Sequence, residues 1–415
     1  MSEWKLNRGE WAEGYVFLKV LGDGRIHAGT ADLKPIEDTY MDVRNVQKRL
    51  GRDVFTFERT QIGRVACLIE CRKNGEKYIG IPSELFDSNA GSLYKAINNA
   101  DKGNISVPEV QQFFESINVN SIKSPPMSAE EIEKYGGKTD IFLRVRNSVD
   151  NMEESIGFSI KSHFGSSATL LNCGPGTNYL FEIENCSDED MLKLNSLDSI
   201  REKLKHIKES DHLRIRSIGS SVVTPKGKNS VSGPVFDYNL EHVDSNFPRV
   251  IPEMLLSLHG YYDDEPKSRN IPDVVDAISK INPLGLRSTS SPYVTMFKNL
   301  LFSAFSGLTA TTLWDGKRRV TGGYLDVSEN GNILYFRALS DDQFLTYLYN
   351  STCIDNPSRG ARQKAIRQEA LKGHIVKDIS RYKGDHGDYG YVFDYNDNGE
   401  TRRVLGINFQ IRFRR

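Results

Sequence analysis

Two short segments in which apolar and polar residues strictly alternate constrain the fold of this chain most strongly. They are KTDIFLRVR and IGFSIK, and the polar loop NSVDNMEE joins them. A period of two is typical of a β-strand with one buried face, and the short connection favours an antiparallel hairpin. The predicted inward-facing residues are Ile141, Leu143, Val145, Ile156, Phe158 and Ile160. The hairpin therefore needs a core on one side and leaves a polar face on the other.

The polar face of the predicted hairpin carries an acid and a lysine. If Asp140 at the start of the first strand pairs with Lys161 at the end of the second, every apolar residue stays on the core face. Carboxylate oxygens suit Mg²⁺, and a neighbouring ammonium stabilises the charge that develops on a phosphate during hydrolysis. An exposed cross-strand ion pair without a catalytic role would show the same spacing. The pattern is therefore compatible with phosphodiester hydrolysis without requiring it.

Length and composition limit the remaining possibilities. Of the 415 residues, 38% are hydrophobic and 26% charged, as in a globular protein of about two to three domains. Lys and Arg number 54 against 55 Asp and Glu, so any nucleic-acid surface must come from local segregation of charge. The 5 scattered cysteines argue against a disulfide framework. With no apolar leader and no stretch of membrane-spanning length, we expect a cytoplasmic protein without membrane contact.

The N-terminal part predicts an amphipathic helix in a mixed α/β protein. Trp11, Tyr15 and Leu18 recur at helical spacing, so they share one side of this helix. The other side carries Glu10 and Glu13. Short alternating strands and two further helices follow, and no internal repeat is present.

The clearest boundary lies in the segment SIKSPPMSAEEIEKYGGKTD. Two prolines break structure there, Ser128 can cap a short helix through Lys134, and two glycines end it. We therefore divide the chain into an N-terminal α/β region at 1–127, a central region with the hairpin at 128–250, and a C-terminal α/β region at 251–415. In the later parts, SDEDMLKLNSLDSIREKLKHIKES predicts one long surface helix and INFQIRFRR a closing strand.

Several segments together resemble the HpaII-type restriction endonucleases. They are NRGEWAEGYVFLKVLGDGRIHA near the N-terminus, KTDI with GFSIKS and LLNCGPGTNYLFEI in the middle, and GDHGDY with INFQIRFR near the end. The resemblance implies a Mg²⁺-dependent type II endonuclease that cuts a short palindrome, CCGG in the member that names the family. It also implies a PD-(D/E)XK-like nuclease core, containing Asp140 and Lys161, in which a central mixed sheet is flanked by helices. A DNA methyltransferase of the same restriction-modification system is implied as functional partner.

The chain departs from the general nuclease pattern two residues before the lysine. The usual acid is replaced there by Ser159, and a hydroxyl is a poorer Mg²⁺ ligand than a carboxylate. Ser159 stays among the catalytic candidates, but a second acid must come from elsewhere. Glu13 and Glu10 on the first helix are the leading candidates, and Glu182 on the next strand is a weaker one. A solvated helix face or a helix cap would explain the two helical acids equally well.

Cleavage of both strands of a palindrome is achieved most simply by a two-fold homodimer on double-stranded DNA. Basic and amide side chains in loops and strands are candidate DNA contacts, although a solvated charged face would look the same. Basic groups also occur in DGKRRV and in the helix-like run from Arg359 to Lys372. The candidates chosen for DNA binding are Asn172, Asn178, Arg214, Arg216, Lys226, Lys228, Gln410 and Arg412.

These inferences predict a restriction endonuclease in which Asp140 and a second acid hold Mg²⁺ while Lys161 supports the attack of water. The alternative is a sequence-specific DNA-binding protein whose nuclease site has decayed, with Ser159 as the sign of decay. Metal-dependent cleavage separates the two hypotheses.

Overall fold

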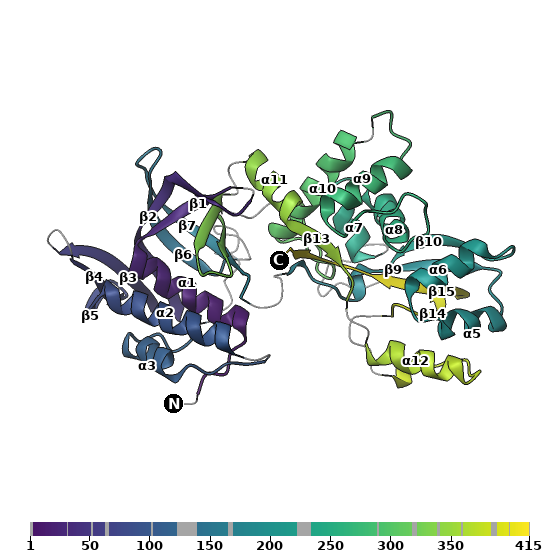
Figure 1. Ribbon diagram of the computed structural model, residues 1–415, viewed down its shortest axis with the longest axis horizontal. Helices are drawn as coiled ribbons and strands as arrows, with labels where there is room; N and C mark the ends of the chain where they lie inside the picture. Colours follow the sequence, from purple (N-terminus) through teal and green to yellow (C-terminus); the bar gives the residue numbers. More distant parts are fainter. Residues whose placement is uncertain are drawn as a thin grey trace. The chain divides into compact units, whose positions relative to one another are not determined.

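The computed structural model divides into two compact units that interleave along the chain (Figure 1). Unit 1 comprises Met1–Ala168, Arg318–Tyr347 and Arg415, and unit 2 comprises Thr169–Lys317 and Leu348–Arg414. The sequence instead favoured three consecutive regions, because it does not reveal that a distant hairpin returns to the first sheet. The structure describes residues 3–30, 32–50, 53–62, 66–100, 103–122, 139–164, 169–221, 234–288, 290–317, 322–337, 341–357, 360–382, 388–397 and 399–414.

Unit 1 is built around a mixed β-sheet. Its described strands are β1 (Arg25–Gly29), β2 (Pro35–Leu50), β3 (Asp53–Ile62), β4 (Ala66–Lys73), β5 (Glu76–Pro82), β6 (Ile141–Asn147), β7 (Glu153–Ser162), β11 (Gly323–Val327) and β12 (Ile333–Arg337). They lie in the order β1-β12-β11-β7-β6-β2-β3-β4-β5, and β1 also pairs with β2, which closes part of the sheet on itself. The β11–β7 and β1–β12 pairs are parallel and the others antiparallel. The expected mixed sheet is confirmed.

The hairpin formed by β6 and β7 has the predicted core face but a different register. Ile141 pairs with Phe158, which brings Asp140 opposite Ser159 rather than Lys161. The two registers differ by two residues, so both keep the same side chains on the core face. The connection decides between them, because Asn151 adopts a left-handed conformation and donates its backbone N–H to the carbonyl of Asn147.

Three helices lie along one side of the unit 1 sheet: α1 (Arg8–Asp23), α2 (Ser83–Asn99) and α3 (Pro108–Ser116) (Figure 1). The predicted first helix is confirmed, with Trp11, Tyr15 and Leu18 buried in the core. A capping box between Asn7 and Glu10 starts α1, and a left-handed Gly24 at φ 76° ends it. The helix is thus fixed at both ends.

The opposite side of the sheet is covered by aromatic residues of α11 (Asp341–Ser351), a helix that crosses the boundary between the units. Within unit 1, Phe344 and Tyr347 pack against Tyr324 of β11, and Tyr347 also packs against Phe336 of β12. Tyr324 and Phe336 stack with their ring centroids 5.0 Å apart. The strand β11 is therefore packed on both faces, which makes its polar side chains unusual.

Unit 2 contains two smaller antiparallel sheets. Its described strands are β8 (Thr169–Leu171), β9 (Asn178–Glu184), β10 (Arg214–Ser220), β13 (Thr352–Asp355), β14 (Val392–Asp397), β15 (Glu400–Asn408) and β16 (Gln410–Phe413). One sheet has the order β10-β9-β15-β14 and the other β13-β16-β8. The predicted closing strand is divided at Phe409 into β15 and β16, and its apolar residues are buried as expected.

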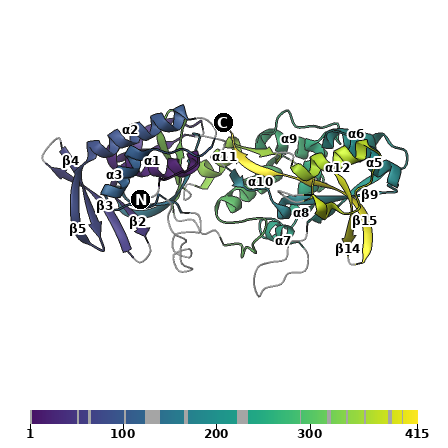
Figure 2. The same ribbon diagram turned by 90° about the horizontal axis from the view of Figure 1, so that it is seen from below.

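The helices of unit 2 surround these sheets (Figure 2). Those described are α5 (Asp188–Ser196), α6 (Ile200–Glu209), α7 (Val235–Glu241), α8 (Phe247–Leu258), α9 (Ile271–Ile281), α10 (Ser290–Phe305) and α12 (Ala361–Leu371), with short 3-10 turns η1 (Pro175–Thr177) and η2 (Ile379–Arg381). The single long helix predicted from the sequence is wrong. Ser199 forms a new capping box with Glu202, so α5 ends and α6 begins there.

Some predictions lie outside the described residues. They include the proline-rich boundary with its short helix from Ser128 to Lys134, and the lysines Lys226 and Lys228. Among the residues that are described, no helix is both long and apolar enough to cross a membrane.

Candidate active site

Asp140 lies where β6 begins, and its carboxylate is held by the neighbouring strand. Its Oδ2 accepts hydrogen bonds from the Ser159 hydroxyl at 3.0 Å and from the backbone N–H of Ile160 at 2.7 Å. The backbone N–H of Asp140 donates to the carbonyl of Phe158 at 2.8 Å. Three contacts to consecutive residues of β7 therefore fix this acid before any ligand binds.

Lys161 follows on the same strand, two residues after Ser159. It stands beside Asp326 of β11 in the parallel β11–β7 register. Burial lowers the pKa of Lys161, whereas the negative charges of Asp140 and Glu13 act in the opposite direction. A partly desolvated ammonium thus lies in the field of two carboxylates that come from different elements. The predicted cross-strand pairing of Asp140 with Lys161 is wrong, since Lys161 lies two residues beyond the position opposite Asp140.

The two acids predicted on α1 have different surroundings. Glu10 belongs to the helix cap, since its Oε2 accepts the backbone N–H of Asn7 at 2.9 Å. Glu13 lies one turn further along and lines a small cavity together with Asp140. The structure therefore brings Glu13, rather than Glu10, to the polar end of the β6–β7 hairpin.

Lys48 of β2 belongs to the same cavity and was missed by the sequence analysis. Its ammonium donates to the carbonyl of Ile122, and burial lowers its pKa to about 8, opposed by the charge of Glu13. A signal was present in the sequence. Lys48 comes two residues after the fully buried Val46, and residues two apart on a strand point to the same face, so Lys48 lies on the core face. The position of β2 next to β6 could not be read from that pattern.

The residues around the cavity fit a divalent cation. Asp140 and Glu13 provide carboxylate oxygens, the ligands that Mg²⁺ prefers, and Mg²⁺ typically takes one or two carboxylates with waters and substrate phosphates completing its shell. Within the described part of the chain, no group of three or more His, Cys, Asp or Glu side chains is arranged to hold a metal ion. A site with two carboxylates is therefore the arrangement these residues can offer.

A second polar cluster on β11 was also missed. The carboxylate of Asp326 is 1% exposed, and its Oδ2 lies 3.0 Å from Nε2 of His163 and accepts the hydroxyl of Tyr347 at 3.2 Å. Its Oδ1 is buried without a hydrogen-bond partner in the described structure. The pKa of His163 is raised, chiefly by its hydrogen bond to Asp326 and against the effect of burial. The pair joins β11 to the residue that directly follows β7.

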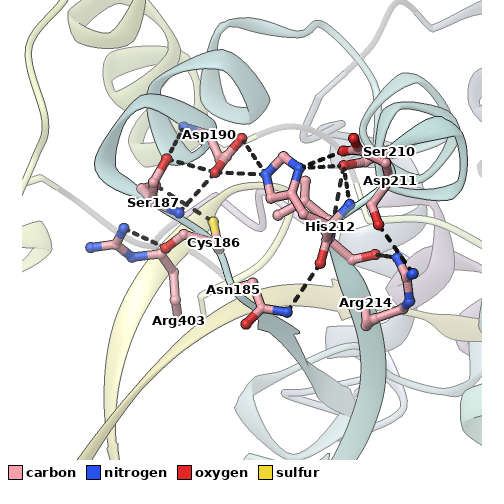
Figure 3. A network of polar contacts seen from close by, with 10 residues as sticks. Asn185, Cys186, Ser187, Asp190, Ser210, Asp211, His212, Arg214 and Arg403 are labelled. Carbon is pink, nitrogen blue, oxygen red and sulfur yellow. Dashed lines mark hydrogen bonds and ion pairs between the residues drawn. The ribbon is translucent and has the colours of Figure 1, made fainter.

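Most of the predicted DNA-contacting residues lie in unit 2. Figure 3 shows Arg214 in a polar network around His212, where its guanidinium donates to the carbonyls of Leu213 at 2.7 Å and Asp211 at 3.1 Å. Arg216 is exposed and forms ion pairs with Glu182 and Glu184 of the neighbouring strand β9. The negative charge of Glu182 is therefore balanced by an ion pair within its own sheet.

The remaining candidates differ in exposure. Asn172 is exposed, whereas Asn178 is buried and its amide donates to the Ser221 hydroxyl at 3.0 Å and to the carbonyl of Asp388 at 2.7 Å. Gln410 and Arg412 on β16 both donate to one carboxylate oxygen of Asp355 on the adjacent strand. In this structure the Asn178 amide is bound to Ser221 and Asp388, which lie outside the strands, and the polar side chains of β16 are paired with β13.

The chemistry available at the hairpin end is phosphate chemistry. Two carboxylates can hold a hard cation, and the desolvated ammonium of Lys161 can neutralise charge on a bound phosphate. A partly buried Lys48 beside Glu13 adds a further positive group.

Comparisons with known proteins agree with this chemistry. Residues 7–369 match the HpaII restriction endonuclease family. The type II restriction enzyme HpaII of Haemophilus parainfluenzae is 31% identical over 413 residues, which cover 98% of either chain. No solved structure matches. The chain therefore belongs to the HpaII restriction endonuclease family and is a type II site-specific deoxyribonuclease.

Proposed function

We propose that this protein makes Mg²⁺-dependent double-strand cuts in DNA at the site formed by Asp140, Glu13 and Lys161. One observation carries the proposal: the partly desolvated ammonium of Lys161 lies in the field of both carboxylates, while Asp140 and Glu13 line one cavity. A surface ion pair without a catalytic role would not gather a second acid from a separate helix.

The same arrangement supports a nuclease core of the PD-(D/E)XK kind. An acid begins one strand of a mixed sheet, a lysine lies near the end of the next strand, and a packed helix contributes another acid. Ser159 occupies the place of the usual second acid and donates to Asp140 instead. In our proposal Glu13 supplies the carboxylate that Ser159 cannot.

In this mechanism Asp140 and Glu13 would hold Mg²⁺. When bound, the ion would neutralise phosphate charge and lower the pKa of a bound water. Asp140 is oriented for this role by Ser159 and the Ile160 amide. Lys161 places its Nζ protons toward the scissile phosphate and stabilises the charge that develops on its oxygens. Cleavage then leaves a 5′-phosphate and a 3′-hydroxyl.

The substrate in our proposal is a short palindrome similar to CCGG. A palindrome is cut on both strands most simply by a homodimer with one active site per subunit. A cognate methyltransferase would protect host DNA in the same restriction-modification system, and both would act in the cytoplasm. Sedimentation of the free protein and of its complex with a palindromic duplex tests the dimer.

The proposed DNA contacts separate into two groups. Asn172 is exposed, whereas Arg214, Arg216, Gln410 and Arg412 already have partners within unit 2 and would exchange them on binding. Each phosphate contact that forms should make DNA affinity more salt dependent. Lys226 and Lys228 stay proposals from the sequence, as does Asn178, whose buried amide would have to leave its present partners.

The function is tested with purified protein, unmethylated plasmid and Mg²⁺, beside an EDTA control and the Lys161→Ala variant, with the ends sequenced. We expect discrete fragments that vanish in both controls, and the end sequences give the recognition site. Intact plasmid with protein that still retards it on a gel would instead identify a DNA-binding protein with a decayed site.

A further inference from the structure

A larger cavity, apart from the nuclease residues, lies entirely within unit 2. It has a volume of about 610 Å³ and lies among the N-terminus of α6, the end of α8, the loop that contains Arg269, and α12. Figure 2 shows α12 beside α5. This size falls within the range of about 300–1,000 Å³ typical of small-molecule sites.

Positive groups outnumber negative ones at the edges of this cavity. Arg201 forms a bidentate ion pair with Glu265, at 2.8 and 2.5 Å, so its charge is balanced. Arg269 and Lys364 also line the cavity, and neither has an ion-pair partner among the described residues. Arg269 is half-buried, and one of its nitrogens donates to the Asn356 side chain at 2.9 Å. The charge of Asp355 acts on Arg269 without forming an ion pair with it, so both cations can still take an anionic ligand.

A buried histidine provides independent evidence for a ligand. His259, directly after α8, lines the cavity and is 5% exposed, and its Nε2 has no hydrogen-bond partner in the described structure. Burial lowers the pKa of His259 to about 3, and the charges of Arg269 and Arg201 act in the same direction. A buried polar atom without a partner is energetically unfavourable, so a ligand that hydrogen-bonds to Nε2 would remove this penalty.

The N-terminus of α6 adds a further feature that favours an anion. Ser199, Ile200 and Arg201 at the start of this 10-residue helix line the cavity. At this start the Ser199 hydroxyl caps the Glu202 N–H, and the Glu202 carboxylate accepts the N–H groups of Asp198 and Ser199, so only the N–H groups of Ile200 and Arg201 remain to favour an anion. On the other side, Lys364 and Arg367 point from successive turns of α12, within the basic run noted in the sequence.

We propose that this cavity binds a nucleotide, with its phosphate between Arg269, Lys364 and the start of α6 and its base reaching His259. The cavity is larger than a phosphate alone requires, and the neutral imidazole can hydrogen-bond to the polar edge of a base. Two sources have this chemistry, a nucleotide extruded from the DNA helix and a free nucleotide. The possibility that the nucleotide belongs to DNA rests on the proposed function.

Isothermal titration calorimetry of the full-length protein with dCMP, dGMP, deoxycytidine and inorganic phosphate tests the site. We expect at least one nucleotide to bind, and Arg269→Gln and Lys364→Ala to weaken it about 10- to 100-fold, because each removes a charge-assisted contact. Lys205→Ala is the matched control, since this exposed lysine lies on α6 and pairs with Glu209 away from the cavity. Thermal melts verify that the variants fold, and Lys364, which is exposed, can be changed without disturbing the core.

A second arm identifies the source. A duplex with 2-aminopurine in the recognition site should gain fluorescence on binding the protein in Ca²⁺, and His259→Phe and Lys364→Ala should reduce the gain. Nucleotide binding without this fluorescence would assign the cavity to free nucleotides. If Arg269→Gln and Lys364→Ala change neither nucleotide nor DNA binding, the proposal is wrong even when the protein cuts DNA. Nucleotide binding by a protein that never cuts DNA would uphold the site and overturn the proposed function instead.

Discussion

The Ser159 hydroxyl donates a hydrogen bond to the Asp140 carboxylate across the β6–β7 hairpin, at 3.0 Å. The position that carries a second acid in the general nuclease pattern therefore serves to orient the first acid. A carboxylate here would lie directly against Asp140, whereas a hydroxyl can donate to it. Ser159 is in this account a positioning residue.

Ser159→Ala should reduce activity without abolishing it. The variant loses one hydrogen bond to a charged group, worth about 1.5–3 kcal/mol, but the Ile160 amide still holds Asp140. We expect cleavage in Mg²⁺ to slow by about 10- to 100-fold, and Ser159→Thr to restore part of the rate. Rates measured under single-turnover conditions check this. A loss as complete as that of Asp140→Ala would make Ser159 a catalytic residue instead.

Glu13→Gln and Glu10→Gln form a matched pair on one helix. Glu13→Gln should abolish cleavage and leave the melting temperature nearly unchanged, because Glu13 lines the cavity with Asp140. Glu10→Gln should keep most of the activity, because a glutamine oxygen can still accept the Asn7 amide. Cleavage assays and thermal melts of both variants test the assignment. The reverse pattern would show that Glu10 is the second acid.

The His163–Asp326 pair should make stability depend on pH. The pKa of His163 in the folded protein is raised above its ordinary value of 6.5 by Asp326. The ion pair therefore contributes fully below pH 6.5, and this contribution is lost as the pH rises through the higher folded-state pKa. Denaturant unfolding should show that His163→Asn destabilises most at low pH. The same substitution at the exposed His374 provides the control. An equal loss of stability for His163→Asn at all pH values would contradict the predicted direction of the pH dependence.

Asn178→Ala should destabilise the protein. Its buried amide joins Ser221 and the Asp388 carbonyl, and removing it leaves the carbonyl without this donor, at a cost of about 1–3 kcal/mol. Chemical denaturation measures the loss. An Asn172→Ala control, at an exposed position, should stay within about 0.5 kcal/mol of the parent.

The faces of the hairpin could be predicted from the sequence, but its register could not. Alternation fixes which residues are inward, and a shift of two residues leaves the faces unchanged. Hence Asp140 and Lys161 could be proposed from the sequence, while the Asp140–Ser159 contact was missed. The turn at Asn151 sets the register through a left-handed backbone, which the loop composition alone does not specify.

Contacts between distant segments were the hardest to predict. Lys48 reaches the site because β2 pairs with β6, and Asp326 meets His163 because β11 returns beside β7. The prediction of one long helix was wrong for a local reason. The cap at Ser199 starts a new helix in spite of the continuous helical pattern around it. Local periodicity was thus enough to predict most helices and strands. The order of the strands in the sheet decides which side chains meet at the candidate site.

The central claim is that Asp140 carries catalysis rather than DNA binding. The direct measurement compares the parent protein and Asp140→Ala in two assays, cleavage of a cognate duplex with Mg²⁺ and its retardation on a gel with Ca²⁺. We expect the variant to lose cleavage by at least about a thousandfold, since a metal ligand supports several kcal/mol of transition-state stabilisation, and to bind DNA with nearly the parent affinity. Loss of binding equal to the loss of cleavage would contradict the account.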